Sequence, residues 1–427
     1  MTARRRSSST AAIWKAAHNA VLRGDASTLE QLLRENRKLF RTEQPPPYPS
    51  SSLAPDYSTG RARAILTGAH QFGSWPQFAR FQKELARKSS PVAQFEAAVD
   101  AIVDGKAGTL SRLLRANPDL VHARSARKHR ATLLHYVGAN GVEDFRQRTP
   151  TNAPRIAEML LKAGADVDAV ADIYGGSTTL ELAATSIHPA NAGVLEDLVG
   201  VLVQHGAAVD GAPGRSIVNA CLANGRLEAA ELLARHGARL DAEGAAGLGR
   251  LDVIKGLTSA RGRGKAVRAD KKLTQAFMWA CEYGHAPVVD FLLRRGVPVT
   301  ARSAPHGQTG LHWAAFAGHP DVVRLLLRRG APVNVKDRRF EGTPLGWTLH
   351  GFAAAASPSV KRRYYAIAAD LVGAGARFEP ETLEDEKIRG DRRMLEALTG
   401  KSGRGKTGTG KRGTGTTGKE KAARKKR

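Results

Sequence analysis

The sequence predicts an all-α solenoid of stacked helix-turn-helix units, with a helical N-terminal extension and a disordered basic C-terminal tail. Residues 273–306 and 307–340 superimpose at an offset of 34, which marks them as two copies of one structural unit. Residues 24–39 align with 105–120 at an offset of 81, so related copies occur earlier in the chain. Because so small a unit cannot bury its own apolar face, each copy must stack on its neighbours.

The order of composition along the chain predicts its domains. We expect a degenerate N-terminal helical pair (1–41), a Pro/Ser-rich linker (42–60), a helical hairpin (61–90), the repeat solenoid with a C-terminal capping helix (91–400) and the disordered basic tail (401–427). Ser74, followed by Gln77, predicts a capping box at the second helix of the hairpin, with Pro76 in its first turn. The segment 387–400 predicts one short helix that shields the last unit, because solenoids need polar-faced ends.

The second of the two matched copies shows how one unit folds. Thr309 can N-cap a first helix over 310–317, and Gly318 supplies the left-handed residue that ends it. Pro320 opens a second helix, where its missing N–H costs little, and that helix ends at Gly330. Val and Leu at helical spacing give the second helix an apolar face, which predicts packing against the next unit.

The segment TGLHWAAFAGHPDVVRLLLRRGAPVNVKD (309–337) resembles an ankyrin repeat, whose pattern begins T-P-L-H-x-A-A and ends L-L-x-x-G-A-x-V-[ND]. Weaker copies bring the total to eight or nine units across about 95–380, with a degenerate one at 11–40. Their order, with insertions between them, resembles a group of bacterial ankyrin-repeat domain-containing proteins. The resemblance implies that His135 and His312 tie neighbouring turns together.

Composition and charge limit the class of protein. No stretch approaches the roughly 20 apolar residues that cross a bilayer, and no apolar segment follows the basic start, so we expect neither membrane insertion nor secretion. The two cysteines exclude a disulfide framework and fit a cytoplasmic location. The net charge is +26, of which residues 401–427 supply +10 through eleven Lys or Arg against a single acid. We expect a monomer.

Features that resemble catalytic motifs have structural explanations. GKSGRGKT (400–407) matches a phosphate-binding loop, but no buried strand precedes it and a low-complexity tract follows, so we reject that function. Cys221 and Cys281 occupy small positions of their units, where a buried thiol is inert; the alternative is a nucleophile beside His285. The histidines lack thiol partners at metal-ligand spacing. We therefore predict no enzymatic activity, no cofactor and no bound metal.

An aromatic column is the best candidate for a partner-binding site. Trp279, Trp313 and Trp347 recur at 34-residue steps in one register of successive units. They can fill space between inner helices, or they can present an aromatic stripe to a partner. Residues just beyond them and in the connecting loops are freer to make contact. The candidate partner-binding residues are Trp279, Glu282, Tyr283, Arg302, His306, Trp313, Phe316, Arg338, Arg339, Phe340 and Trp347.

These observations favour a non-enzymatic protein–protein interaction scaffold that binds a protein partner through a concave helix face and the inter-repeat loops. A second hypothesis is a nucleic-acid-associated protein, in which the basic tail and the basic insertion 261–272 contact phosphates in a salt-sensitive way. The tail carries no interleaved aromatic residues for base stacking, and it can equally be a solubilising terminus.

Overall fold

The structure is a computed structural model of the chain. It describes residues 2–42, 61–138, 142–143, 146–212, 214–259 and 270–400. Over these residues the regular structure is helical, and extended backbone pairs only at three isolated β-bridges. The helices form two compact units, Met1–Val297 and Pro298–Arg427. The division between the units lies inside the repeat array, within the repeat copy 273–306.

Several predicted features lie outside the described residues. They are the linker from residue 43 to 60, the basic insertion up to residue 269, and the tail 401–427 with the phosphate-loop match that begins at Gly400.

The helices of the first unit are α1 (Thr2–Arg23), α2 (Ala26–Glu35), α3 (Arg37–Thr42), α4 (Ala62–Ala69), α5 (Trp75–Leu85), α6 (Pro91–Val103), α7 (Ala107–Ala116), η2 (Pro118–His122), η3 (Leu133–Val137), α8 (Ala153–Lys162), α9 (Thr179–Thr185), α10 (His188–Asn191), α11 (Leu195–Gln204), α12 (Ile217–Ala223), α13 (Leu227–Arg235), α14 (Ala242–Gly247), α15 (Leu251–Ser259), α17 (Lys271–Glu282) and α18 (Ala286–Arg295), where η marks a 3-10 helix. Those of the second unit are α19 (Gly310–Phe316), α20 (Pro320–Arg328), α21 (Pro344–Ala354), α22 (Pro358–Gly373), η5 (Pro380–Glu384), α23 (Glu386–Arg389) and α24 (Arg392–Thr399).

The N-terminal extension has its own hydrophobic core. Trp14 of α1, Leu29 of α2 and Phe78 of α5 are buried in it. The predicted capping box at Ser74 is wrong. Ser74 is the N-cap residue, but its side chain makes no capping hydrogen bond, and Gln77 Oε1 accepts the backbone N–H of Gly73 at 3.0 Å in place of that of Ser74.

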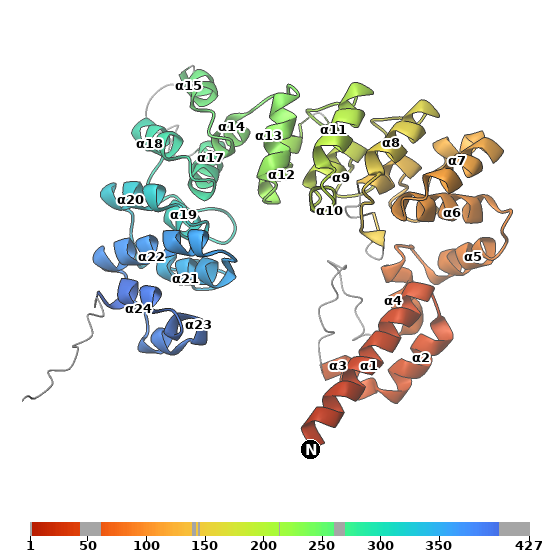
Figure 1. The fold of residues 1–427 in the computed structure, drawn as a ribbon, viewed down its shortest axis with the longest axis horizontal. Helices are drawn as coiled ribbons and strands as arrows, with labels where there is room; N and C mark the ends of the chain where they lie inside the picture. The colour runs from red at the N-terminus through yellow and green to blue at the C-terminus, as the bar shows by residue number, and fades with distance from the viewer. Residues whose placement is uncertain are drawn as a thin grey trace, which may run out of the picture. The chain divides into compact units, whose positions relative to one another are not determined.

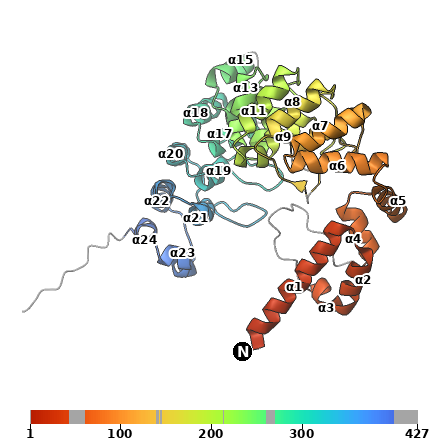
Figure 2. The ribbon, with the colours of Figure 1, turned by 45° about the vertical axis from the view of Figure 1, so that its right-hand side comes forward.

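In the first unit the repeat helices stack in two rows (Figure 1). The first helices of successive repeats, α6, η3, α9, α12, α14 and α17, each contact the next and form the inner row. The second helices α8, α11 and α13 also contact one another and belong to the outer row, as the turned view in Figure 2 shows. Their apolar faces share one continuous core from Phe95 to Trp279. The predicted solenoid of helical pairs is confirmed, and neighbouring repeats together enclose what one repeat cannot.

One inner helix is shorter than the repeat pattern predicts. The unit that begins at Thr132 forms only a 3-10 helix, η3, which ends at Gly138. A Cβ atom on Gly138 would lie 3.0 Å from the backbone nitrogen of Ala183 in α9, so the chain approaches α9 closely at this position and a side chain does not fit there.

The second unit continues the same arrangement within itself. Helix α19 packs against α21, α20 packs against α22, and α24 covers α22. Met394 and Leu398 of α24 are buried in that contact. The predicted single helix over 387–400 is wrong: α23 ends at Arg389, before Gly390, and Asp391 caps a new helix by accepting the backbone N–H groups of Arg393 and Met394.

The predicted tying of turns by histidine is confirmed in both units. The backbone N–H of Thr309 donates to His312 Nδ1 at 3.1 Å, so Nε2 carries the ring proton and donates to the Gly342 carbonyl at 3.1 Å. His135 bridges in the same way from its own Thr–His capping box to the carbonyl of Ser177, at 3.3 Å. Each ring therefore joins the start of one repeat to the loop that precedes the next.

Candidate partner-binding surface

Asp337 builds the loop 337–342, which connects α20 to α21. Its side chain is buried and accepts the backbone N–H groups of Arg339 and Phe340 at 2.8 Å each, and of Gly342 at 2.9 Å. Burial alone would raise the pKa of Asp337, but these hydrogen bonds hold it below its usual range. The loop is therefore fixed from within, while the Phe340 ring at its tip is 66% exposed.

Trp347 lies at the centre of an aromatic cluster in the second unit. Its ring centroid is 5.4 Å from that of Trp313, 5.5 Å from that of Phe316 and 6.3 Å from that of Phe340, in edge-to-face arrangements. The indole N–H of Trp347 donates to Asp337 Oδ2 at 3.0 Å, which joins the cluster to the loop. Helices α19 and α21 and the loop thus contribute to one aromatic surface, parts of which remain accessible.

Exposed arginines surround this aromatic cluster. Arg302 Nη1 donates to the carbonyl of Lys336 at 3.2 Å, and the backbone N–H of Arg338 donates to the carbonyl of His306 at 2.7 Å. These bonds tie the preceding loop, 302–309, to loop 337–342. The side chains of Arg302 and Arg338 are exposed, so the two loops together present positive charge to solvent.

Arg339 lies against the exposed aromatic ring. Its guanidinium carbon is 5.1 Å from the centroid of Phe340, within the range of a cation–π contact. Nη1 of Arg339 also lies 3.5 Å from Nε2 of His306. The ring of Phe340 is accordingly held by Trp347 and by Arg339, with its remaining surface open to solvent.

The other three candidate residues belong to the first unit, at the end of α17. Trp279 is 8% exposed and lies in the shared core of that unit. The Tyr283 hydroxyl donates to the carbonyl of Leu222 in a preceding repeat. Burial raises the pKa of Glu282 to about 7. The packing interpretation of the tryptophan column fits Trp279, whereas Trp313 and Trp347 are only half-buried and stay candidates for contact.

The sequence analysis missed an exposed aromatic residue in the first unit. Tyr174 is 65% exposed in the loop closed by the β-bridge between Ala171 and Ser177. This loop corresponds to loop 337–342, because its Ser177 carbonyl faces His135 as the Gly342 carbonyl faces His312. Counting from the histidines would have identified Tyr174, but the insertion between the repeats hid the correspondence.

A buried network of charged side chains was also missed. Arg127 is 3% exposed and pairs with Glu96 at 2.5 Å and with Glu143 at 3.3 Å. Arg146 contacts the same two carboxylates, at 2.7 Å and 2.8 Å. The Tyr136 hydroxyl donates to Glu143 Oε1 at 2.7 Å. The network joins α6, the first-repeat loop and the insertion that follows η3.

Electrostatics indicates that this network is held in its charged form. Burial alone would raise the pKa of Glu143, but the positive charges of Arg127 and Arg146 lower it to about 2. Burial also raises the pKa of Tyr136, so its hydroxyl stays protonated and acts as a donor. Because each carboxylate is already paired, the arrangement fits a structural role in the first repeat.

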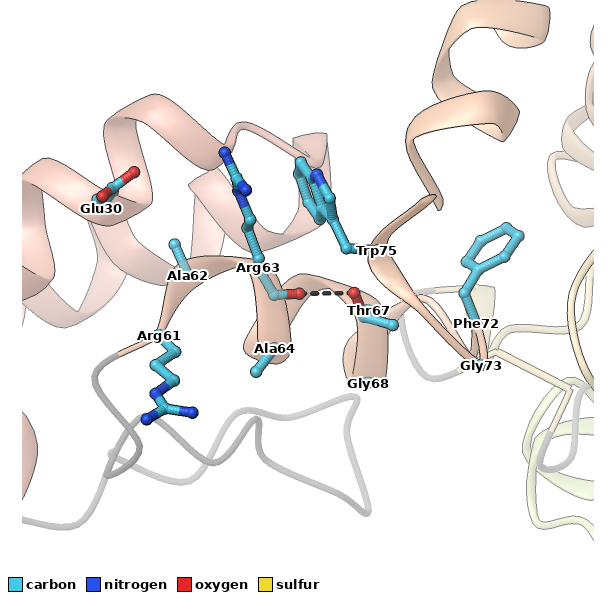
Figure 3. Close-up of a pocket in the computed structure, with 10 residues that line it drawn as sticks. All are labelled: Glu30, Arg61, Ala62, Arg63, Ala64, Thr67, Gly68, Phe72, Gly73 and Trp75. Atoms are coloured by element: carbon cyan, nitrogen blue, oxygen red, sulfur yellow. Dashed lines mark hydrogen bonds between the residues drawn. The ribbon is translucent and has the colours of Figure 1, made fainter. Parts of the chain in front are cut away.

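A cavity of about 810 Å³ lies beside α4 in the N-terminal extension (Figure 3). The guanidinium carbon of Arg63 is 5.3 Å from the ring centroid of Trp75, and the Thr67 hydroxyl donates to the Arg63 carbonyl at 2.6 Å. Among the described residues, Glu30 is the only carboxylate that lines the cavity. This lining brings together no acid and base that could share a proton.

The two thiols are buried, as the sequence predicts. Burial raises the pKa of Cys221 to about 12 and raises that of Cys281 well above its usual value. Both thiols are therefore protonated at neutral pH, which makes them poor nucleophiles. Within the described ranges, no group of three or more His, Cys, Asp or Glu side chains could hold a metal ion. In the same ranges, no helix combines the length and apolar character that a membrane span requires.

Comparison with known families identifies the class of repeat. Residues 243–337, from α14 through α20 to Asp337, match a family described as ankyrin repeats, with three copies. Ankyrin repeats are thus present in this part of the chain, and repeats of this class generally act as protein–protein interaction modules. Among curated proteins, no sequence matches the chain. The bacterial grouping that the repeat order suggested stays a prediction.

Proposed function

We propose that the chain is a non-enzymatic protein–protein interaction scaffold that binds its partner through the second unit. The contact surface consists of loops 302–309 and 337–342 with the accessible parts of α19 and α21. The observation that carries this proposal is Phe340, whose ring is 66% exposed on a loop fixed by Asp337. A rigidly held aromatic ring loses little conformational entropy on binding, so burying it contributes strongly to affinity. In this proposal the protein acts as a cytoplasmic monomer.

Charge supports a partner that presents an acidic segment. Residues 298–378 contain eleven Lys or Arg against four Asp or Glu. Lys336, Arg338 and Arg339 are exposed around Phe340, and one exposed acid, Glu341, accompanies them in the loop. Positive charge at the rim of an interface accelerates association with an acidic partner and makes that rate depend on salt.

Replacement of the exposed ring tests the proposal. Phe340→Ala removes the aromatic contact and leaves the Asp337 hydrogen bonds to the backbone intact, so the fold should persist. We expect partner affinity to fall about 30-fold, which corresponds to about 2 kcal/mol for a hot-spot aromatic residue. Affinity is measured by titrating the captured partner against the full-length protein after nuclease treatment. Leu257→Ala is the control, since Leu257 is an exposed apolar residue of α15; equal losses in both variants would refute the proposed surface.

A nucleic-acid-associated protein is the second candidate function. Its support is the net charge of +26, with +10 in residues 401–427 and further basic residues in the insertion 261–272. Deletion of 401–427 tests it. If the tail holds nucleic acid, retention on the full chain should decrease steeply as salt increases, and the truncated chain should retain far less at low salt. Unchanged retention after the deletion would exclude the tail as the contact.

A further inference from the structure

A second cavity in the first unit lies between α5 and a loop of the first repeat. Its volume is about 350 Å³. The loop is closed by the β-bridge between Arg124 and Thr132. The lining residues are Phe72, Gly73, Gln77, Arg80, Phe81, Glu84, Val92, Ala126, Arg127, Lys128 and Arg130. The cavity lies outside the partner-binding surface, and it shares only Phe72 and Gly73 with the lining of the cavity beside α4.

The walls of this junction cavity are fixed by contacts across it. The backbone N–H of Lys128 donates to the carbonyl of Gln71 at 2.9 Å, which joins the loop to the N-terminal extension. The guanidinium carbon of Arg127 lies 4.7 Å from the ring centroid of Phe81. Because Glu96 and Glu143 neutralise Arg127, that residue forms a wall without adding net charge.

Three other cations line the same small space. The side chains of Arg80, Lys128 and Arg130 are exposed at its mouth. Glu84, the one carboxylate among the described lining residues, pairs with Arg87. Across the described ranges, neither Arg80 nor Lys128 forms an ion pair with a carboxylate. The cavity therefore has an excess of positive charge that nothing in the described protein neutralises.

The backbone at this junction is also unusual. Gln71 and Arg130 both adopt the left-handed region, at φ values of 58° and 52°. Side chains other than glycine rarely adopt this conformation, and strained residues of this kind cluster at functional sites. In this conformation Arg130 lines the cavity while its guanidinium donates to the Ser125 carbonyl at 3.3 Å. The strain thus coincides with the excess of positive charge.

We propose that the junction cavity binds the phosphate group of a small soluble phosphate ester. A phosphate monoester carries about two negative charges at neutral pH and offers three acceptor oxygens, which suits a lining with three cations better than one carboxylate does. The volume lies near the lower end of the roughly 300–1,000 Å³ typical of small-molecule sites, so a sugar phosphate is of suitable size. Apolar atoms of Phe72, Phe81 and Val92 contribute the remaining lining.

Calorimetric titration of the full-length protein tests this site at constant ionic strength. The probes are inorganic phosphate and ribose 5-phosphate. We expect saturable binding to one site for both, with ribose 5-phosphate binding at least as tightly. The variant R80Q/K128Q should bind at least tenfold more weakly. The matched control is R112Q/R115Q, which removes the same charge from the exposed face of α7 and should bind as the unaltered chain does.

Three results would overturn the proposal. They are the absence of saturable binding, an equal loss in both double variants, and binding of inorganic phosphate without binding of ribose 5-phosphate. An equal loss would mean that diffuse positive charge attracts the anion. The changed side chains are exposed, so both variants should keep the circular dichroism spectrum of the unaltered chain. The single variant Lys128→Gln, with an expected weakening of severalfold, provides a test if R80Q/K128Q does not fold.

Discussion

At the scale of single residues, the buried His135 makes the free energy of unfolding depend on pH. Burial lowers the pKa of this histidine to about 4 in the folded chain, against an ordinary value of 6.5. The unfolded chain therefore binds the proton more readily, and the free energy of unfolding decreases as pH falls from about 6.5 to about 4. Burial disfavours the charged ring, and the unprotonated Nδ1 accepts the Thr132 N–H in the folded chain.

This histidine yields a measurable pH dependence. We expect the His135→Asn variant to lose less stability than the unaltered chain between pH 6.5 and pH 4, by about 3 kcal/mol for a shift of this size. Urea unfolding of both chains across that pH range measures the difference. Identical slopes in the two chains would show that His135 is protonated equally in the folded and unfolded states.

Asp337 is the residue on which the proposed contact loop depends. In Asp337→Asn the amide NH₂ replaces Oδ2, which accepts hydrogen bonds from the Gly342 backbone and the Trp347 indole. The N–H groups of Gly342 and Trp347 then face an NH₂ group, which cannot accept their hydrogen bonds. We therefore expect the free energy of unfolding to fall by about 3 kcal/mol. Partner affinity should also fall, because Phe340 loses its fixed position. Chemical denaturation measures the first effect, and an unchanged midpoint would contradict the proposed hydrogen bonds.

At the scale of elements, the buried network fixes the insertion after η3 to the first repeat. Glu143→Gln leaves Arg127 with Glu96 alone and Arg146 with Glu96 and Asp100, and breaking a buried pair costs about 3–5 kcal/mol. The control is Glu158→Gln, which breaks the exposed pair with Lys162 and should cost below about 1 kcal/mol. Urea unfolding compares the two variants. Equal decreases in the free energy of unfolding of the two variants would show that burial of the network contributes nothing to stability.

The same network predicts acid sensitivity in the first unit. Because the pKa of Glu143 is lowered to about 2 on folding, its contribution to stability is complete above about pH 4.5 and decreases as pH falls toward 2. This range overlaps that of His135 only between about pH 4 and pH 4.5, so one acid titration can separate the two effects.

Some elements follow from local sequence, and others depend on contacts between distant residues. Thr309 and His312 define the start of α19 because their capping bonds are local. The break at Gly390 is less visible, since Asp391 competes with a helix pattern that continues through it. The close approach of Gly138 to α9 involves a segment more than 40 residues further along the chain, so no local pattern encodes it.

At the scale of the whole molecule, the sequence indicates the solenoid but only part of the candidate site. Phe340 could be predicted because residues in connecting loops are usually accessible. Trp279 and Trp313 share one register, yet one is buried in the core and the other half-buried, because burial depends on the neighbouring repeat. Glu96, Arg127 and Glu143 are far apart in sequence and meet only after folding, so periodicity gives no sign of their network.

The most direct test of the central claim is photo-crosslinking from the proposed contact loop. A photoreactive phenylalanine analogue placed at position 340 of the full-length chain should form a covalent adduct with a protein partner, and nuclease treatment should leave that adduct intact. The same analogue at position 257 should yield little or none of it. A nuclease-sensitive adduct, or equal adduct formation from both positions, would contradict the account.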